Sequence, residues 1–211
     1  MGFGGRINFF NLITAMKKER KQTFEAYNHR ILWGAADRNL SLATSQNEDA
    51  KFFALGAMFL FFAAFEGYLN WLGTRIAPEV WEDERQFFSR SPFQGPLGKY
   101  IFLAKILHLP NPDSSNGPLQ TAHDLYKLRN MVAHPKAEAG EKQVKFRDGC
   151  LPPRYKSELE KKVSPDAATR AKDHLEKLAE QLHREAKNIH SSDIHESNAF
   201  GPIFCTEITD A

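Results

Sequence analysis

Hydrophobic and polar positions follow the period of an α-helix along most of the chain. The clearest pattern begins after Ser164, a favourable N-cap residue that is followed by Pro165, which suits the first helical position. Apolar residues then recur at i, i+3, i+4 and i+7 spacing, which predicts a helix with one buried stripe. This stripe consists of Ala168, Ala171, Leu175, Leu178, Leu182 and Ile189.

Helical patterns also cover most of the preceding chain, and prolines mark several of their ends. The sequence predicts that Pro110 and Pro135 each end a helix, because proline lacks a backbone N–H and restricts the residue before it. Between residues 143 and 149 the pattern is compatible with a short strand. The predicted helices cover about residues 6–31, part of the thirties, 50–75, 99–109 and 118–134.

The segment FFALGAMFLFFAAF, residues 52–65, is the most apolar part of the chain and contains no charge. A membrane-spanning helix needs about 18–20 apolar residues, and Glu66 interrupts this run before that length. Extending the run to Leu72 would place a carboxylate and Asn70 in the bilayer, which is costly. We therefore favour a core helix over a membrane span and expect no membrane partner.

These elements predict an all-α fold, an α-helical bundle with a long central apolar helix. A small β-hairpin insertion near residues 143–155 is compatible with the pattern. Hydrophobic residues make up 42% of the chain and include 17 Phe, enough for a sizeable core. We expect one helical domain over residues 1–190, followed by a poorly ordered acidic tail over residues 191–211.

The net charge of +2 conceals an uneven distribution. Residues 127–156 contain eight Lys or Arg against three Asp or Glu, a local charge of +5, whereas residues 191–211 contain four acids and no Lys or Arg. The distant Cys150 and Cys205 indicate neither a disulfide framework nor a metal site. With no signal-peptide pattern at its start, the chain is expected in the cytoplasm.

The stretch LYKLRNMVAHPK, residues 125–136, is a candidate functional segment, because it places an arginine, an asparagine and a histidine near the end of a predicted helix. At 100° per residue, Leu125, Leu128 and Val132 share one face of the predicted helix and should point to the core. Arg129 lies on the flank of this face, and the opposite side carries His123, Lys127, Asn130 and His134. The helix therefore carries a polar face of mixed chemistry to its last turn.

Arg129, Asn130 and His134 can meet on one patch at this helix end. Because His134 precedes a proline, we expect it to leave the helical geometry and to turn toward the other two. The simpler interpretation is a solvated face, on which the helix dipole favours a protonated histidine at the C-terminus. Both interpretations are compatible with the sequence.

Glu66 and Asn70 are polar residues one turn apart on the long apolar helix. A carboxylate in such surroundings requires a partner. One interpretation is an ion pair with Arg129 or Arg75, and the other is a supporting role for both polar residues, which would orient the arginine or histidine of a site. We favour support over direct catalysis, because a carboxylate paired with arginine stays ionised.

The sequence Arg129-Asn130-x-x-x-His134 resembles the RN-x-x-x-H form of the motif of HEPN domains (higher eukaryotes and prokaryotes nucleotide-binding). The helix segment FFAAFEGYLNWL, which contains Glu66, also resembles the long apolar helix of that family. The resemblance implies a helical bundle that forms homodimers. It further implies a metal-independent endoribonuclease of a toxin–antitoxin or antiviral system, without a cofactor.

The resemblance also implies roles for the motif residues. His134 would be the general acid and base for attack of an RNA 2′-OH on the adjacent phosphate, which leaves a 2′,3′-cyclic phosphate. Arg129 would bind the phosphate through its planar fork, and Asn130 would orient His134 or a phosphate oxygen. Lys127 and Lys136 are the expected RNA contacts in the basic segment, and for Lys136 a solvated lysine without a ligand is the equal alternative.

Two further hypotheses remain at this point. A HEPN module can be non-catalytic and bind nucleotide, RNA or a partner protein, and an antitoxin or regulatory protein is a second kind of partner. The acidic segment 191–211, with Phe200, would act as an autoinhibitor if it folded back on the basic cleft. A tail without a role is the simpler alternative.

Overall fold

The computed structural model describes residues 20–45, 48–110, 113, 115, 117–138, 154–202 and 204–210. The chain divides into a helical unit, residues 27–203, and a terminal unit formed by residues 1–26 and 204–211. The hairpin expected near residues 143–155 falls almost wholly on residues 139–153, which lie outside the described residues.

The described residues of the helical unit form helices and connecting loops, with no strand, and the prediction of a mainly α-helical fold is confirmed. The short helices α3, α4 and α7 were not predicted. The helices are α1 (Asn28–Ser45), α2 (Ala50–Ile76), α3 (Pro78–Trp81), α4 (Glu84–Phe87), α5 (Gly95–Ile106), α6 (Gly117–Ala133), α7 (Glu158–Lys162) and α8 (Pro165–Ile189).

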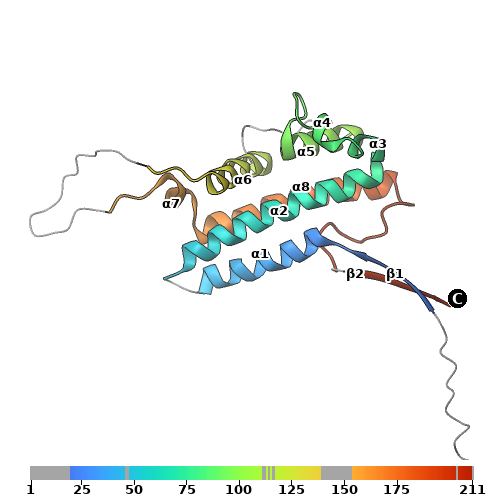
Figure 1. Ribbon diagram of the computed structural model, residues 1–211, viewed down its shortest axis with the longest axis horizontal. Helices are drawn as coiled ribbons and strands as arrows, with labels where there is room; N and C mark the ends of the chain where they lie inside the picture. Colours follow the sequence, from blue (N-terminus) through green and yellow to red (C-terminus); the bar gives the residue numbers. More distant parts are fainter. Residues whose placement is uncertain are drawn as a thin grey trace, which may run out of the picture. The chain divides into compact units, whose positions relative to one another are not determined.

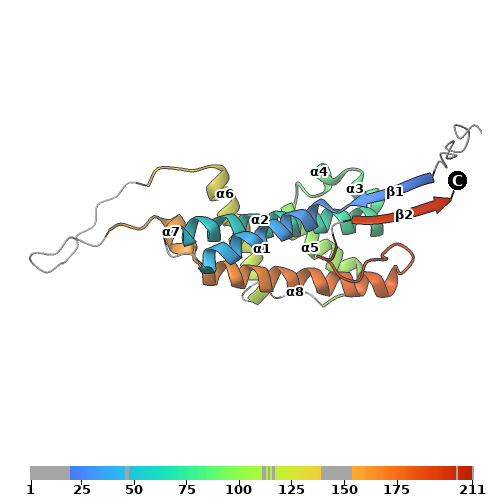
Figure 2. The ribbon, with the colours of Figure 1, turned by 90° about the horizontal axis from the view of Figure 1, so that it is seen from below.

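Helix α2 is the centre of the helical unit, as its composition predicts. It packs against α1, α8, α5 and α6 (Figures 1 and 2). Phe61, Phe65 and Leu69 are fully buried in these contacts. Among the described helices, α2 alone is long and apolar enough to cross a membrane, but half of its most apolar window is buried inside the unit. Such burial is typical of the core helix of a soluble protein.

Helix α8 confirms the prediction made from its capping residues. The Ser164 side chain accepts a hydrogen bond from the backbone N–H of Ala167 at 3.1 Å, and Pro165 is the first helical residue. Leu175 and Leu182 are fully buried, but Ile189 is 50% exposed. Ile189 therefore does not belong to the buried stripe, because it lies on the last residue of the helix, beyond the packed core.

The terminal unit contains two strands, β1 (Arg20–Ala26) and β2 (Phe204–Asp210). They pair antiparallel, from Arg20 opposite Asp210 to Ala26 opposite Phe204. The prediction of a helix over residues 6–31 is therefore wrong for residues 20–26, and residues 6–19 lie outside the described residues. Pairing with a distant segment decides the structure here, and β-structure depends on such context more than helix does.

Residues 191–202 pack on the helical unit, so the prediction of a poorly ordered tail is wrong for this segment. Ile194 and Ala199 are buried. The ring of Phe200 stacks on that of Trp33, with 3.8 Å between centroids and 8° between planes. Buried aromatic contacts of this kind favour an ordered segment.

Arg30 of α1 holds the same segment through its backbone. Its guanidinium donates to the carbonyl oxygens of Pro202 at 2.6 Å and Asn198 at 3.0 Å. The contacts of residues 194–202 thus lie on α1, α2 and α8, and none of these residues lines the pocket at the end of α6. For residues 194–202, this arrangement contradicts a fold-back on the basic cleft.

Candidate functional site

Helix α6 places the motif residues as the helical wheel predicts. Leu125 and Leu128 are buried against the core, and Val132 is half-buried. The helix ends at Ala133, yet the backbone N–H of His134 still donates to the Asn130 carbonyl at 3.0 Å. His134 thus keeps one helical hydrogen bond before the proline, and its side chain is exposed to solvent.

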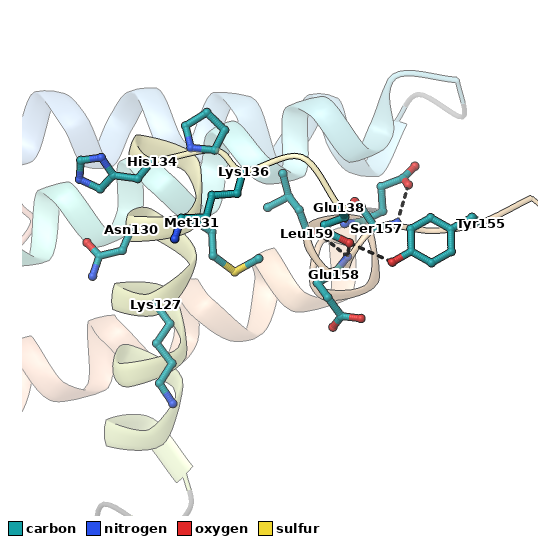
Figure 3. Close-up of a pocket in the computed structure, with 12 residues that line it drawn as sticks. Lys127, Asn130, Met131, His134, Lys136, Glu138, Tyr155, Ser157, Glu158 and Leu159 are labelled. Carbon is teal, nitrogen blue, oxygen red and sulfur yellow. Dashed lines mark hydrogen bonds between the residues drawn. The ribbon is translucent and has the colours of Figure 1, made fainter. Parts of the chain in front are cut away.

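An open pocket of about 900 Å³ lies beside the end of α6 (Figure 3). It brings together four predicted site residues, Lys127, Asn130, His134 and Lys136. Asn130 and His134 extend from the same side of the helix end in Figure 3. The lining consists of Lys127, Asn130, Met131, His134, Pro135, Lys136, Glu138, Tyr155, Ser157, Glu158, Leu159 and Glu160.

Two of the glutamates in the pocket have cationic and backbone partners. Glu158 forms an ion pair with Lys161, which lowers the pKa of its carboxyl group. Glu160 pairs with Arg154 at 2.8 Å and accepts the backbone N–H of Ser157 at 3.0 Å, and this backbone hydrogen bond lowers its pKa. Both carboxylates are therefore ionised at neutral pH, and both are occupied, in the sense that they already bind donors of the protein.

The third glutamate, Glu138, is also occupied. Its two carboxylate oxygens accept the backbone N–H of Glu158 at 3.2 and 3.0 Å, and the Tyr155 hydroxyl donates to one of them at 3.0 Å. The hydrogen bond to Glu138 raises the pKa of Tyr155, so its hydroxyl stays protonated. All three acids of the pocket therefore have donors.

Unlike these acids, the polar side chains from α6 and the residues after it have no partner among the described residues. Within the part of the chain that the structure describes, the side chains of Lys127, Asn130, His134 and Lys136 make no hydrogen bond or ion pair. Two ammonium groups, an amide and an imidazole thus remain available on one side of the pocket. Such a set can bind an anion with several oxygens, such as a phosphodiester.

Arg129 does not line this pocket with Asn130 and His134. Its Nη2 lies 4.0 Å from Glu66 Oε2, and the two side chains are 41% and 26% exposed. The partner expected for Glu66 is therefore Arg129. The pair is long and partly solvated, which leaves most of the guanidinium donors available.

Asn70 is not part of the site, contrary to its predicted supporting role. Its Oδ1 accepts a hydrogen bond from the buried Lys99 at 2.8 Å, and Lys99 also pairs with Glu84. A buried ammonium requires such acceptors. Asn70 thus serves a polar cluster between α2, α4 and α5, and Glu66 alone of the two reaches the motif.

The wall of the pocket opposite α6 was not predicted from the sequence. The pattern Ser157-x-x-Glu160 is a capping-box signature, and both of its hydrogen bonds are present at the start of α7. This local signal is enough to predict the start of α7 from the sequence. The contact between Tyr155 and Glu138 joins residues 17 positions apart, and no local pattern predicts it.

The described residues contain no group of three or more His, Cys, Asp or Glu side chains placed to hold a metal ion. No family model, curated protein or solved structure matches the chain. The residues of the pocket and the motif that lines it are therefore the basis for assigning a function.

Proposed function

We propose that the chain is a HEPN-type, metal-independent endoribonuclease of a cytoplasmic toxin–antitoxin or antiviral defence system. The supporting observation is the pocket at the end of α6. Lys127, Asn130, His134 and Lys136 line it without partners among the described residues, whereas its acids are occupied. This combination favours a polyanion as the ligand.

In the proposed reaction, His134 removes the proton of an RNA 2′-OH, and the 2′ oxygen attacks the adjacent phosphorus. The bond from phosphorus to the 5′ oxygen breaks, the 5′ oxygen takes a proton from the imidazolium, and a 2′,3′-cyclic phosphate remains. Imidazole suits both steps, because its neutral ring nitrogen accepts a proton and the protonated ring can return it. Asn130 orients His134 or a phosphate oxygen, while Lys127 and Lys136 bind neighbouring phosphates.

Arg129 is assigned to the charge that builds on the phosphate in the transition state. Arg129 does not line the pocket of the single chain. We therefore place the reaction in a homodimer, in which the two α6 ends lie together and Arg129 of one copy reaches the pocket of the other. Phe52 and Phe59 of α2 are 74% and 39% exposed and offer apolar surface for such a contact. An antitoxin or regulatory protein is a second partner compatible with this surface.

The purified protein is expected to cut single-stranded RNA in the presence of EDTA. Mass spectrometry of the products should detect 2′,3′-cyclic phosphate and 5′-hydroxyl ends, as attack by the 2′-OH requires. Activity only after addition of Mg²⁺, or products with 5′-phosphate ends, would contradict the proposed mechanism. DNA of the same sequence is the matched control, because it lacks the nucleophile and should remain intact.

A second candidate function is a non-catalytic HEPN module that binds nucleotide, RNA or a partner protein. The separation of Arg129 from the pocket favours it, since one chain does not assemble the whole motif. RNA binding by the wild-type protein without any cleavage, unchanged in His134→Ala, would support this function over the nuclease.

Replacing Glu66 by glutamine is expected to lower the rate of RNA cleavage by about fivefold, the equivalent of about 1 kcal/mol, because a partly exposed pair holds Arg129 only weakly. The free energy of unfolding should change by less than about 1 kcal/mol. Glu79→Gln, an exposed position on α3, is the control with the same charge change. Equal rates in the two variants would remove Glu66 from the site.

A further inference from the structure

Tyr155 is an exposed aromatic side chain in the pocket of the motif residues. It is 59% exposed although its hydroxyl is bonded, and the pocket that it lines also contains Lys127 and Lys136. Large exposed aromatic rings next to cationic side chains are typical of sites that bind single-stranded nucleic acid. The position of Tyr155 therefore raises the question of what its ring contacts.

The ring is held in place before any ligand arrives. The Tyr155 hydroxyl donates to Glu138, whose oxygens are fixed by the backbone N–H of Glu158 at the start of α7. The Nζ atom of Lys161 lies 5.7 Å from the ring centroid. A ring held in this way loses little conformational freedom on binding, which favours affinity.

A purely structural role explains only part of this arrangement. The hydrogen bond between Tyr155 and Glu138 links two residues that flank the segment 139–153, and this link uses the hydroxyl alone. It does not require that most of the aromatic side chain be accessible inside a pocket. The accessible ring is the feature that a ligand would use.

Figure 3 shows Tyr155 and His134 at opposite ends of the pocket, with Met131 and Leu159 between them. A ligand that reaches both ends has a phosphate near His134 and a planar group on the ring. Because the two ends are separate, the planar group belongs to a nucleotide that flanks the cut.

We propose that Tyr155 is a nucleobase-stacking site and that the substrate of the pocket is single-stranded RNA. This inference rests on the proposed function, since it assigns the phosphate to the end of the pocket that carries His134. Bases in a duplex are paired and stacked on one another, and they do not offer a free face to the ring. The stacked base positions the strand and takes no part in bond breaking.

The test is the binding of fluorescent RNA oligomers, followed by anisotropy in EDTA with the His134→Ala protein, which leaves the probe uncut. Tyr155→Ala should weaken binding of a single strand by about five- to a hundredfold, the range of alanine substitutions at base-stacking rings. Tyr155→Phe keeps the ring and should stay within about threefold of the parent. Phe87→Ala, an exposed aromatic residue on α4 outside the pocket, should leave binding unchanged.

An abasic oligomer of the same length separates stacking from a structural role. Its binding depends on phosphates alone, so Tyr155→Ala should not affect it. Equal losses for the abasic and the ordinary strand would overturn the inference, as would an ordinary strand that binds Tyr155→Ala normally. A loss of duplex binding as large as that of the single strand would overturn it as well.

The nuclease proposal and the stacking proposal fail in different ways. Tyr155-dependent binding to a wild-type protein that never cuts RNA would overturn the nuclease and leave the stacking site. Cleavage with an unchanged KM in the Tyr155→Ala variant of the otherwise wild-type chain would overturn the stacking site and leave the nuclease. If both hold, KM should rise about five- to a hundredfold in that variant while kcat changes little.

Discussion

Replacing His134 by alanine is expected to lower the rate of RNA cleavage by a factor of about 10²–10⁴, the usual contribution of a general acid or base. The imidazole is exposed and makes no hydrogen bond or ion pair with the described residues, so its loss should change the free energy of unfolding by less than about 0.5 kcal/mol. Initial rates on a labelled single strand in EDTA measure the effect. Circular dichroism confirms that the variant is folded.

His123→Ala is the matched control for this experiment. His123 lies on the same helix and is half-buried, but it does not line the pocket. This variant should therefore keep the wild-type rate. If His123→Ala and His134→Ala lost activity equally, the cause would be damage to α6, and a fully active His134→Ala would exclude the proposed mechanism. In cells, His134→Ala should relieve any toxicity that expression of the chain produces, and His123→Ala should not.

Replacing Gly98 by alanine is expected to destabilise the helical unit by about 3 kcal/mol or more, because the site has no room for a methyl group. A Cβ atom there would lie 1.9 Å from the backbone carbonyl carbon and oxygen of Phe93. These backbone atoms cannot rotate away as a side chain can. The chain before α5 is also held by the hydrogen bond from the N–H of Gly95 to the carbonyl of Phe88 at 2.9 Å.

Gly34→Ala is the control for this substitution, with the opposite sign. A Cβ atom at Gly34 in α1 meets no atom within 4 Å, and alanine favours a helix interior by about 0.5–1 kcal/mol over glycine. Urea unfolding of both variants measures the difference. Since each change restricts the unfolded chain in the same way, opposite signs must come from the folded state. Equal stability of the two variants would contradict the close approach at Gly98.

The sequence predicts best those elements whose signals are local. The cap at Ser164 and the first-turn Pro165 lie next to the residues that they organise, and α8 begins where they indicate. The apolar run in residues 52–65 likewise identifies the core helix, because burial of so many large side chains needs neighbours on several sides.

The errors have a common physical cause, which is contact between residues far apart in the chain. Residues 20–26 form a strand only because residues 204–210 pair with them. Phe200 packs on the helical unit because it stacks on Trp33, and Asn70 accepts a hydrogen bond from Lys99 instead of supporting the motif. None of these partners can be identified from hydrophobic periodicity, which reports only the local environment.

In the candidate site, too, the features set by local sequence were predicted and those set by distant contacts were not. The helical wheel correctly places Asn130 on the polar side of α6, and the pocket collects it with His134 and two lysines. Arg129, one residue away, points to Glu66 because a step of 100° carries it toward α2. Tyr155 was not predicted as a site residue, because it belongs to a separate segment and the sequence of the motif helix does not indicate which segment packs opposite it.

The pairing of β1 with β2 delays the completion of this sheet while the chain is synthesised on the ribosome. Strand β1 is synthesised before the helical unit, and its partner β2 follows only after residues 27–203. Until then the edge of β1 has unpaired backbone groups that can recruit other nascent strands. Newly made chains are therefore exposed to aggregation through β1, and in need of a chaperone, until β2 has been synthesised and has paired with it.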